Sequence, residues 1–155
     1  MSHRPQSDTR RDTSAQTQQW FTTRSHQLVT RLLPGTDLKH ALQAVVSSHG
    51  LAAATMVTCV GSLKVAHLRL AGATTTQTFD GPFEIVSLVG TLCPDGVHLH
   101  LSISNREGSV FGGHLLDGNI IHTTAEIALA VYNDVGFSRP LDPETGYGEL
   151  QVLEV

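Results

Sequence analysis

The chain has 155 residues, of which 40% are hydrophobic, and a formal net charge of −4. This composition excludes a wholly disordered chain and predicts one domain with a real core. No apolar run approaches the roughly 18 residues of a membrane-spanning helix, and the N-terminus lacks the apolar segment of a secretory signal. We therefore expect a cytoplasmic protein with no membrane partner. Cys59 and Cys93 lie in apolar runs, which favours reduced, buried thiols.

Charge is divided unevenly along the chain. Residues 1–31 hold five arginines and two aspartates, a formal +3, which leaves five basic and twelve acidic residues, a formal −7, for residues 32–155. A core of this sign repels a phosphate backbone, which counts against non-specific nucleic acid binding by the core. Residues 1–23 are polar and lack hydrophobic periodicity, so we predict a disordered tail there and a single domain at residues 24–155.

The first predicted elements are a strand and a helix. Apolar alternation marks the strand at residues 27–33. Apolar residues then recur at the spacing of one helical face over residues 38–46, after Thr36 or Asp37 as the capping residue. Gly50 is a typical helix stop. This is the clearest helix in the chain.

Strands dominate the rest of the sequence. β-Branched and alternating residues predict strands at 55–60, 64–70 and 83–92, two strands between Val97 and Leu115, and an edge strand at 150–155. Residues 119–132 fit a helix or a strand by spacing alone, and the flanking strands favour a strand for at least the first half. Residues 71–78 and the segment after Asp134 are expected to be mainly loop.

The stretch from Val97 to Leu115 gathers groups that bind metals, protons or anions. His98 and His100 are two residues apart, so on a strand they point to the same face. His114 lies on the returning strand, behind two glycines that either allow a close backbone approach or mark a bulge. If these strands pair, three imidazoles meet on one face.

Three such imidazoles suit zinc or another divalent transition metal ion, with one coordination position left open. The alternative is that His98, His100 and His114 pack and hydrogen-bond within the sheet or at a subunit interface. Glu126 is a further candidate, either as a carboxylate beside a metal or as a polar interface residue.

Six segments occur in an order that resembles the PPC (plants and prokaryotes conserved) domain, also known as a domain of unknown function and as the PD1-like DNA-binding motif. They are RLLPGTDL (31–38), the turn at 60–63, LRLA (68–71), GPFEIVSLVGTL (81–92), HLHLSISNREGSVFGGHL (98–115) and TTAEI (123–127). The resemblance covers about residues 25–135. It implies a single α+β domain, a mainly antiparallel sheet flanked by a few helices, with TTAEI as a strand, and a homotrimer.

The resemblance also implies partners. The plant members carry an AT-hook that enters the minor groove of DNA; this chain has none, so it resembles the stand-alone prokaryotic form. In plants the segment similar to GPFEIV contacts partner proteins, and here Pro82 replaces an arginine. The implied partner or interface residues are Gly81, Phe83, Glu84 and Ile85, while His98, His100 and His114 match histidines of the prokaryotic pattern.

These observations leave three hypotheses for function. The first is a non-enzymatic homotrimer that acts through DNA, with the N-terminal arginines as the contact, or through a protein partner. The second is a metal-dependent enzyme or small-molecule binder, whose ion activates water or holds a carboxylate. In the third, the metal is structural. The sequence holds no Ser-His-Asp arrangement, P-loop or dinucleotide fingerprint, so it names no reaction and favours a non-enzymatic role.

Overall fold

The computed structural model describes residues 19–72 and 74–155, so the tail predicted at residues 1–23 falls largely outside the described residues. It has the predicted α+β fold with a mainly antiparallel sheet, and the described residues form one helix where the resemblance implies a few. No helix in the described part of the chain is long and apolar enough to cross a membrane. The elements in chain order are β1 (Ser25–Leu32), α1 (Leu38–His49), β2 (Ala54–Arg69), β3 (Thr76–Cys93), β4 (Gly96–Ser104), β5 (Val110–Leu115), β6 (Ile120–Tyr132), β7 (Val135–Ser138) and β8 (Gln151–Glu154).

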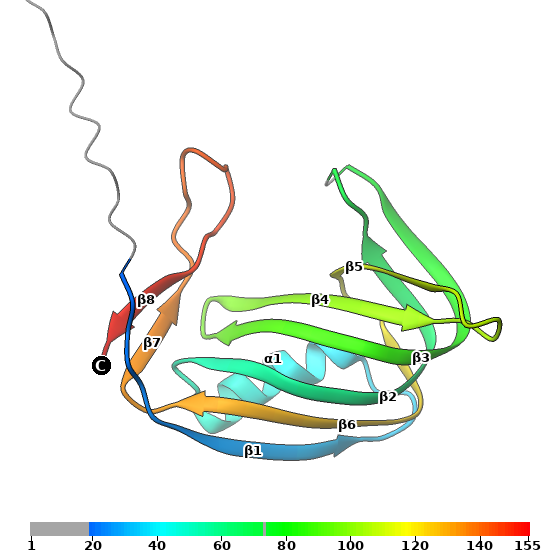
Figure 1. The fold of residues 1–155 in the computed structure, drawn as a ribbon, viewed down its shortest axis with the longest axis horizontal. Helices are drawn as coiled ribbons and strands as arrows, with labels where there is room; N and C mark the ends of the chain where they lie inside the picture. The colour runs from blue at the N-terminus through cyan, green and yellow to red at the C-terminus, as the bar shows by residue number, and fades with distance from the viewer. Residues whose placement is uncertain (1–18, 73) are drawn as a thin grey trace, which may run out of the picture.

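Six strands form one antiparallel sheet in the order β1-β6-β2-β3-β4-β5 (Figure 1). The end of β5 also pairs with the end of β2, so strands β2 to β5 curl and close on one another. β7 and β8 form a separate two-stranded sheet, from which the segment 139–150 projects as a long loop (Figure 1).

The helix α1 begins and ends where its capping residues predict. The carboxylate of Asp37 accepts a hydrogen bond from the backbone N–H of His40 at 3.0 Å, which satisfies one of the free donors of the first turn. Gly50 ends the helix in the left-handed conformation, with φ of +61°. Between these caps, Leu38, Leu42 and Val46 lie on one face and are buried.

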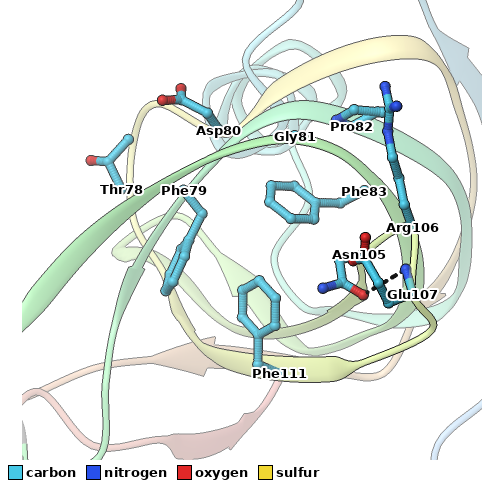
Figure 2. A pocket seen from close by; sticks show the side chains of 10 residues that line it. All are labelled: Thr78, Phe79, Asp80, Gly81, Pro82, Phe83, Asn105, Arg106, Glu107 and Phe111. Carbon is cyan, nitrogen blue, oxygen red and sulfur yellow. Dashed lines mark hydrogen bonds between the residues drawn. The ribbon is translucent and has the colours of Figure 1, made fainter.

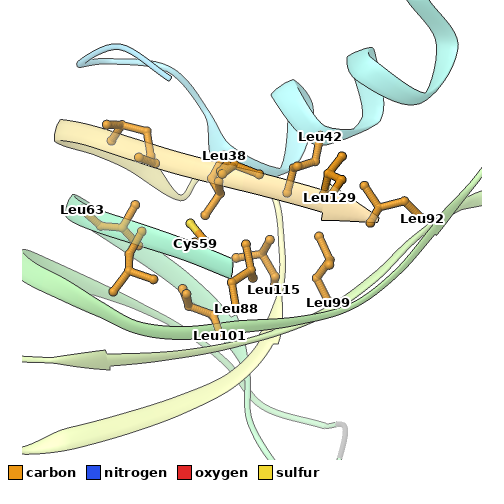
Figure 3. Packing of buried hydrophobic residues seen from close by; sticks show 14 of the residues in the cluster. Leu38, Leu42, Cys59, Leu63, Leu88, Leu92, Leu99, Leu101, Leu115 and Leu129 are labelled. Atoms are coloured by element: carbon orange, nitrogen blue, oxygen red, sulfur yellow. The ribbon is translucent and has the colours of Figure 1, made fainter. Parts of the chain in front are cut away.

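The core lies between this helical face and one face of the sheet. Figure 3 shows Leu38 and Leu42 of α1 above leucines from β2, β3, β4 and β6. Because side chains alternate along a strand, the neighbours of these buried residues point to the opposite face, which we call the open face. The open face carries exposed valines from three strands, namely Val29 on β1, Val60 on β2 and Val89 on β3.

The strands are longer than the sequence predicts. β2 runs through Gly61 and Ser62, where we expected two strands, with shifts of register instead of a break. A side chain at Gly61 would overlap the carbonyl oxygen of Thr124 on β6, so this glycine permits close strand packing and does not end the strand. β3 already begins within the expected loop at residues 71–78, and β7 lies in the expected loop after Asp134.

Candidate metal centre

The three histidines come together on the open face because two neighbouring strands place them there. His98 and His100 lie two residues apart on β4, and their side chains are exposed on the same side. His114 on β5 pairs directly with His100 and, on the other edge of its strand, with Arg69 of β2. The strand pairing across the 105–108 turn therefore occurs as the sequence predicts.

The three imidazoles are close enough to share one ion. One ligand atom from each of His98, His100 and His114 lies within 4.8 Å of the others. Nε2 of His98 is 3.2 Å from Nε2 of His100, and the ring centroids are 5.1 to 5.5 Å apart. A tetrahedral zinc ion with bonds of about 2.0–2.1 Å holds two nitrogens roughly 3.4 Å apart, so only side-chain adjustments are needed.

The double glycine before His114 lets three strands approach closely. A side chain at Gly112 would overlap the carbonyl oxygen of Leu101 on β4, and a Cβ at Gly113 would lie 2.6 Å from the carbonyl oxygen of Arg69 on β2. The pairing of β4 with β5 continues through both glycines without a shift of register. Of the two interpretations, the close approach is therefore correct and the bulge is wrong.

The surroundings keep two of the imidazoles neutral. Burial, followed by the charge of Arg69, lowers the pKa of His114 to about 4. Burial and the nearby Arg139 also lower the pKa of His98. A histidine binds a metal through the lone pair of an unprotonated nitrogen, so both residues are ready to do so at neutral pH.

The residues present fit a bound metal ion. Nitrogen is a preferred donor for zinc and other first-row ions, and a set of three leaves a position for a further ligand. Nδ1 of His114 is buried and has no hydrogen-bond partner among the described residues, which is costly for a polar atom that serves packing alone. The three histidines would hold the ion, and the ion would supply a Lewis acid.

Sequence reasoning missed Arg139, which lies beside this cluster. Its Nη1 atom is 3.5 Å from Nδ1 of His98, and its backbone N–H donates to the carboxylate of Asp95. These contacts join β4 and the β3–β4 turn to a segment about forty residues further along the chain, and no periodicity predicts such a contact. The sequence signal that could have found Arg139 is a single arginine directly after the short, mainly apolar segment Val135–Ser138.

The other predicted residues lie away from the cluster. Phe83 and Ile85 are 6% exposed and belong to the core, whereas Glu84 is exposed. Gly81 and Phe83 line a separate hollow of about 490 Å³. Figure 2 shows the ring of Phe83 turned toward two other phenylalanine rings there.

Glu126 is exposed on β6, opposite Val60, and β2 and β3 separate it from β4.

An antiparallel sheet with a helix on one face and a three-histidine cluster on the other defines a small α+β domain with a candidate metal centre. The family model of the Plants and Prokaryotes Conserved (PCC) domain matches residues 21–133. The chain belongs to this family, which confirms the PPC resemblance.

Several known proteins are similar to the chain. A hypothetical protein from Salmonella enterica is 36% identical with a TM-score of 0.84, over 86% of this chain and 97% of that one. A metal-containing protein from Archaeoglobus fulgidus shares the fold, with 21% identity and a TM-score of 0.72 over 86% and 99%. The bifunctional protein GlmU of Synechococcus sp. (strain JA-3-3Ab) is 48% identical over 125 residues, 81% of this chain and 20% of that protein. The chain spans about a fifth of the length of the curated relatives it matches.

Proposed function

We propose that this PPC domain binds one divalent transition metal ion, such as zinc, at His98, His100 and His114, and that the ion binds a small molecule at its open position. The observation that carries this proposal is the meeting of three imidazoles from two strands. The name of the A. fulgidus relative as a metal-containing protein supports it. Both cysteines are free and buried, in keeping with the expected cytoplasmic location.

We also propose that the chain forms the homotrimer that the family resemblance implies. Val60 is 55% exposed in the single chain and Val29 is 72% exposed, although both lie on strands of an ordered sheet. Moving a fully exposed valine side chain out of water contributes about 1.5–3 kcal/mol, and the part of each side chain that is still exposed contributes its share of that amount. The open face therefore favours contact with further copies, which would also screen the histidine cluster from bulk solvent.

Elemental analysis and solution mass, measured on one preparation without a histidine tag, test both proposals. We expect about one zinc or similar ion per chain, and a mass about three times the 16.6 kDa of the chain. A trimer without metal would remove the metal proposal and make the histidines structural. A monomer with metal would remove the homotrimer and leave the ion site intact.

Removal of the ion with a chelator tests whether the ion holds the subunits together. If it does, chelation would dissociate the trimer. If the ion serves ligand binding, the trimer would stay assembled after chelation.

DNA binding is the second candidate function, and we infer that any contact lies in the N-terminal segment. Residues 32–155 carry a formal −7, whereas residues 1–31 carry +3, and three of the five arginines of this segment lie within residues 1–23. Three such segments on one trimer would bind with avidity. A gel-shift experiment at low salt should show binding by the full chain and none after deletion of residues 1–23. Equal binding by both forms would place the contact in the core, and no binding by either would end this candidate.

A further inference from the structure

Arg139 anchors the segment after β7 beside the three histidines. Its Nη1 atom donates to the carbonyl oxygen of Gly148 at 3.4 Å and lies 3.5 Å from Nδ1 of His98, while Nη2 donates to the hydroxyl of Thr91. Its backbone N–H donates to the carboxylate of Asp95 at 2.9 Å. The guanidinium carries five N–H donors. Its two oxygen acceptors therefore leave other donors free, and Nε is buried without a partner among the described residues.

Positive charge outweighs negative charge around the cluster. Within residues 19–72 and 74–155, neither Arg139 nor Arg69 forms an ion pair with a carboxylate. The guanidinium of Arg69 instead lies over the ring of Tyr147, 5.7 Å from its centroid. Of the residues that line the hollow beside the cluster, Glu149 is the acidic one. A divalent ion adds two further positive charges, so the site attracts an anion.

The hollow beside the cluster has room for a small molecule. It measures about 270 Å³ and lies between β3, β4 and the segment 139–150. His98, His100 and Arg139 form its polar part, while Val89 and Leu150 give it an apolar edge and are 55% and 43% exposed. This lining matches the usual ligand pocket, in which a few polar groups orient a partly apolar molecule.

We propose that this hollow binds a small carboxylic acid, with its carboxylate at the guanidinium of Arg139 beside the three-histidine ion and its short carbon chain against Val89 and Leu150. The inference rests on the proposed metal function and names the class of its ligand. The planar fork of an arginine matches the two oxygens of a carboxylate. The apolar edge suits a carbon chain, which inorganic phosphate lacks. Arg139 also lies beyond residues 21–133, the part that the family model matches, so this specificity belongs to the C-terminal part of the chain.

Cobalt(II) in place of zinc supplies a visible spectrum that reports the ion and its ligands separately. We expect the metal-free protein to take up cobalt, and propanoate to change the spectrum in a saturable way. Arg139→Gln should weaken propanoate binding by roughly tenfold or more, because a charge-assisted hydrogen bond is lost. Arg139→Lys keeps the charge without the planar fork and should weaken binding less. Arg106→Gln removes the same charge from the exposed turn at 105–108 and should leave propanoate binding unchanged.

The cobalt and propanoate measurements distinguish a failure of the metal proposal from a failure of the carboxylate proposal. If wild-type protein shows no cobalt spectrum, the metal proposal fails, and the carboxylate site fails with it. If cobalt binds but propanoate has no effect, or if neutral propanamide binds equally well, the metal proposal stands and the carboxylate inference is overturned. Unchanged propanoate binding in both Arg139 variants also overturns it. Binding of inorganic phosphate without binding of propanoate would replace the proposed ligand class.

Discussion

Zinc affinity is expected to fall by roughly 100-fold or more when His114 is replaced by alanine, since even residues that only support a metal ligand cost 10–100-fold. His114 is the one ligand on β5, and it lies between His100 and Arg69 in the strand pairing. Its loss leaves two ligands from a single strand, which cannot surround the ion on three sides. Competition with a coloured chelator measures the affinity, and circular dichroism confirms that the variant is folded.

His122→Ala is the matched control for this experiment. His122 is also a strand histidine and is exposed, but it lies on β6, away from the three-histidine cluster. Its removal should leave the zinc affinity of the protein unchanged. Unaltered affinity in His114→Ala, or an equal loss in the two variants, would contradict the assignment of the site.

Gly90→Ala is expected to lower the free energy of unfolding by more than about 4 kcal/mol. Single substitutions cause losses of this size only when they severely disturb the backbone or the packing. Gly90 has a φ of +139° on β3, and an added Cβ would overlap the backbone carbonyl oxygen of His98 on β4. The two strands can accept the methyl group only by separating. The same separation would displace His98, so zinc affinity should fall together with stability.

Gly96→Ala separates the two causes. Gly96 has nearly the same φ, +136°, but an added Cβ would meet no atom within 4 Å. This variant carries the backbone strain alone and should lose about 1–3 kcal/mol. Urea denaturation of both variants at one protein concentration gives the comparison. Equal losses would show that the strain dominates and that the close approach of β3 and β4 has little effect.

The sequence predicts the structure best where residues only a few positions apart determine it. The helix was predictable because its apolar spacing, its cap at Asp37 and its stop at Gly50 all act within a few residues. The histidine cluster was predictable because His98 and His100 share a strand face and a short turn brings His114 back to them. Its role in binding metal remains a prediction.

Features that depend on the packing of distant segments were not predictable in this way. Gly61 looked like the end of a strand, although its role is to let β6 approach β2. The residues Val135–Ser138 are too few to show an alternating pattern, so β7 was missed, and Arg139 with it. One partner of Arg139 is Asp95 in the β3–β4 turn, and only the folded chain brings the two together.

The most direct test of the metal proposal is anomalous diffraction at the zinc absorption edge, from crystals of the tag-free protein loaded with zinc. The proposal predicts one strong peak per chain on the open face of the sheet. This peak should lie about 2.0–2.1 Å from one nitrogen of each of His98, His100 and His114. A peak elsewhere, or fully occupied zinc at another site with none among these histidines, would contradict it.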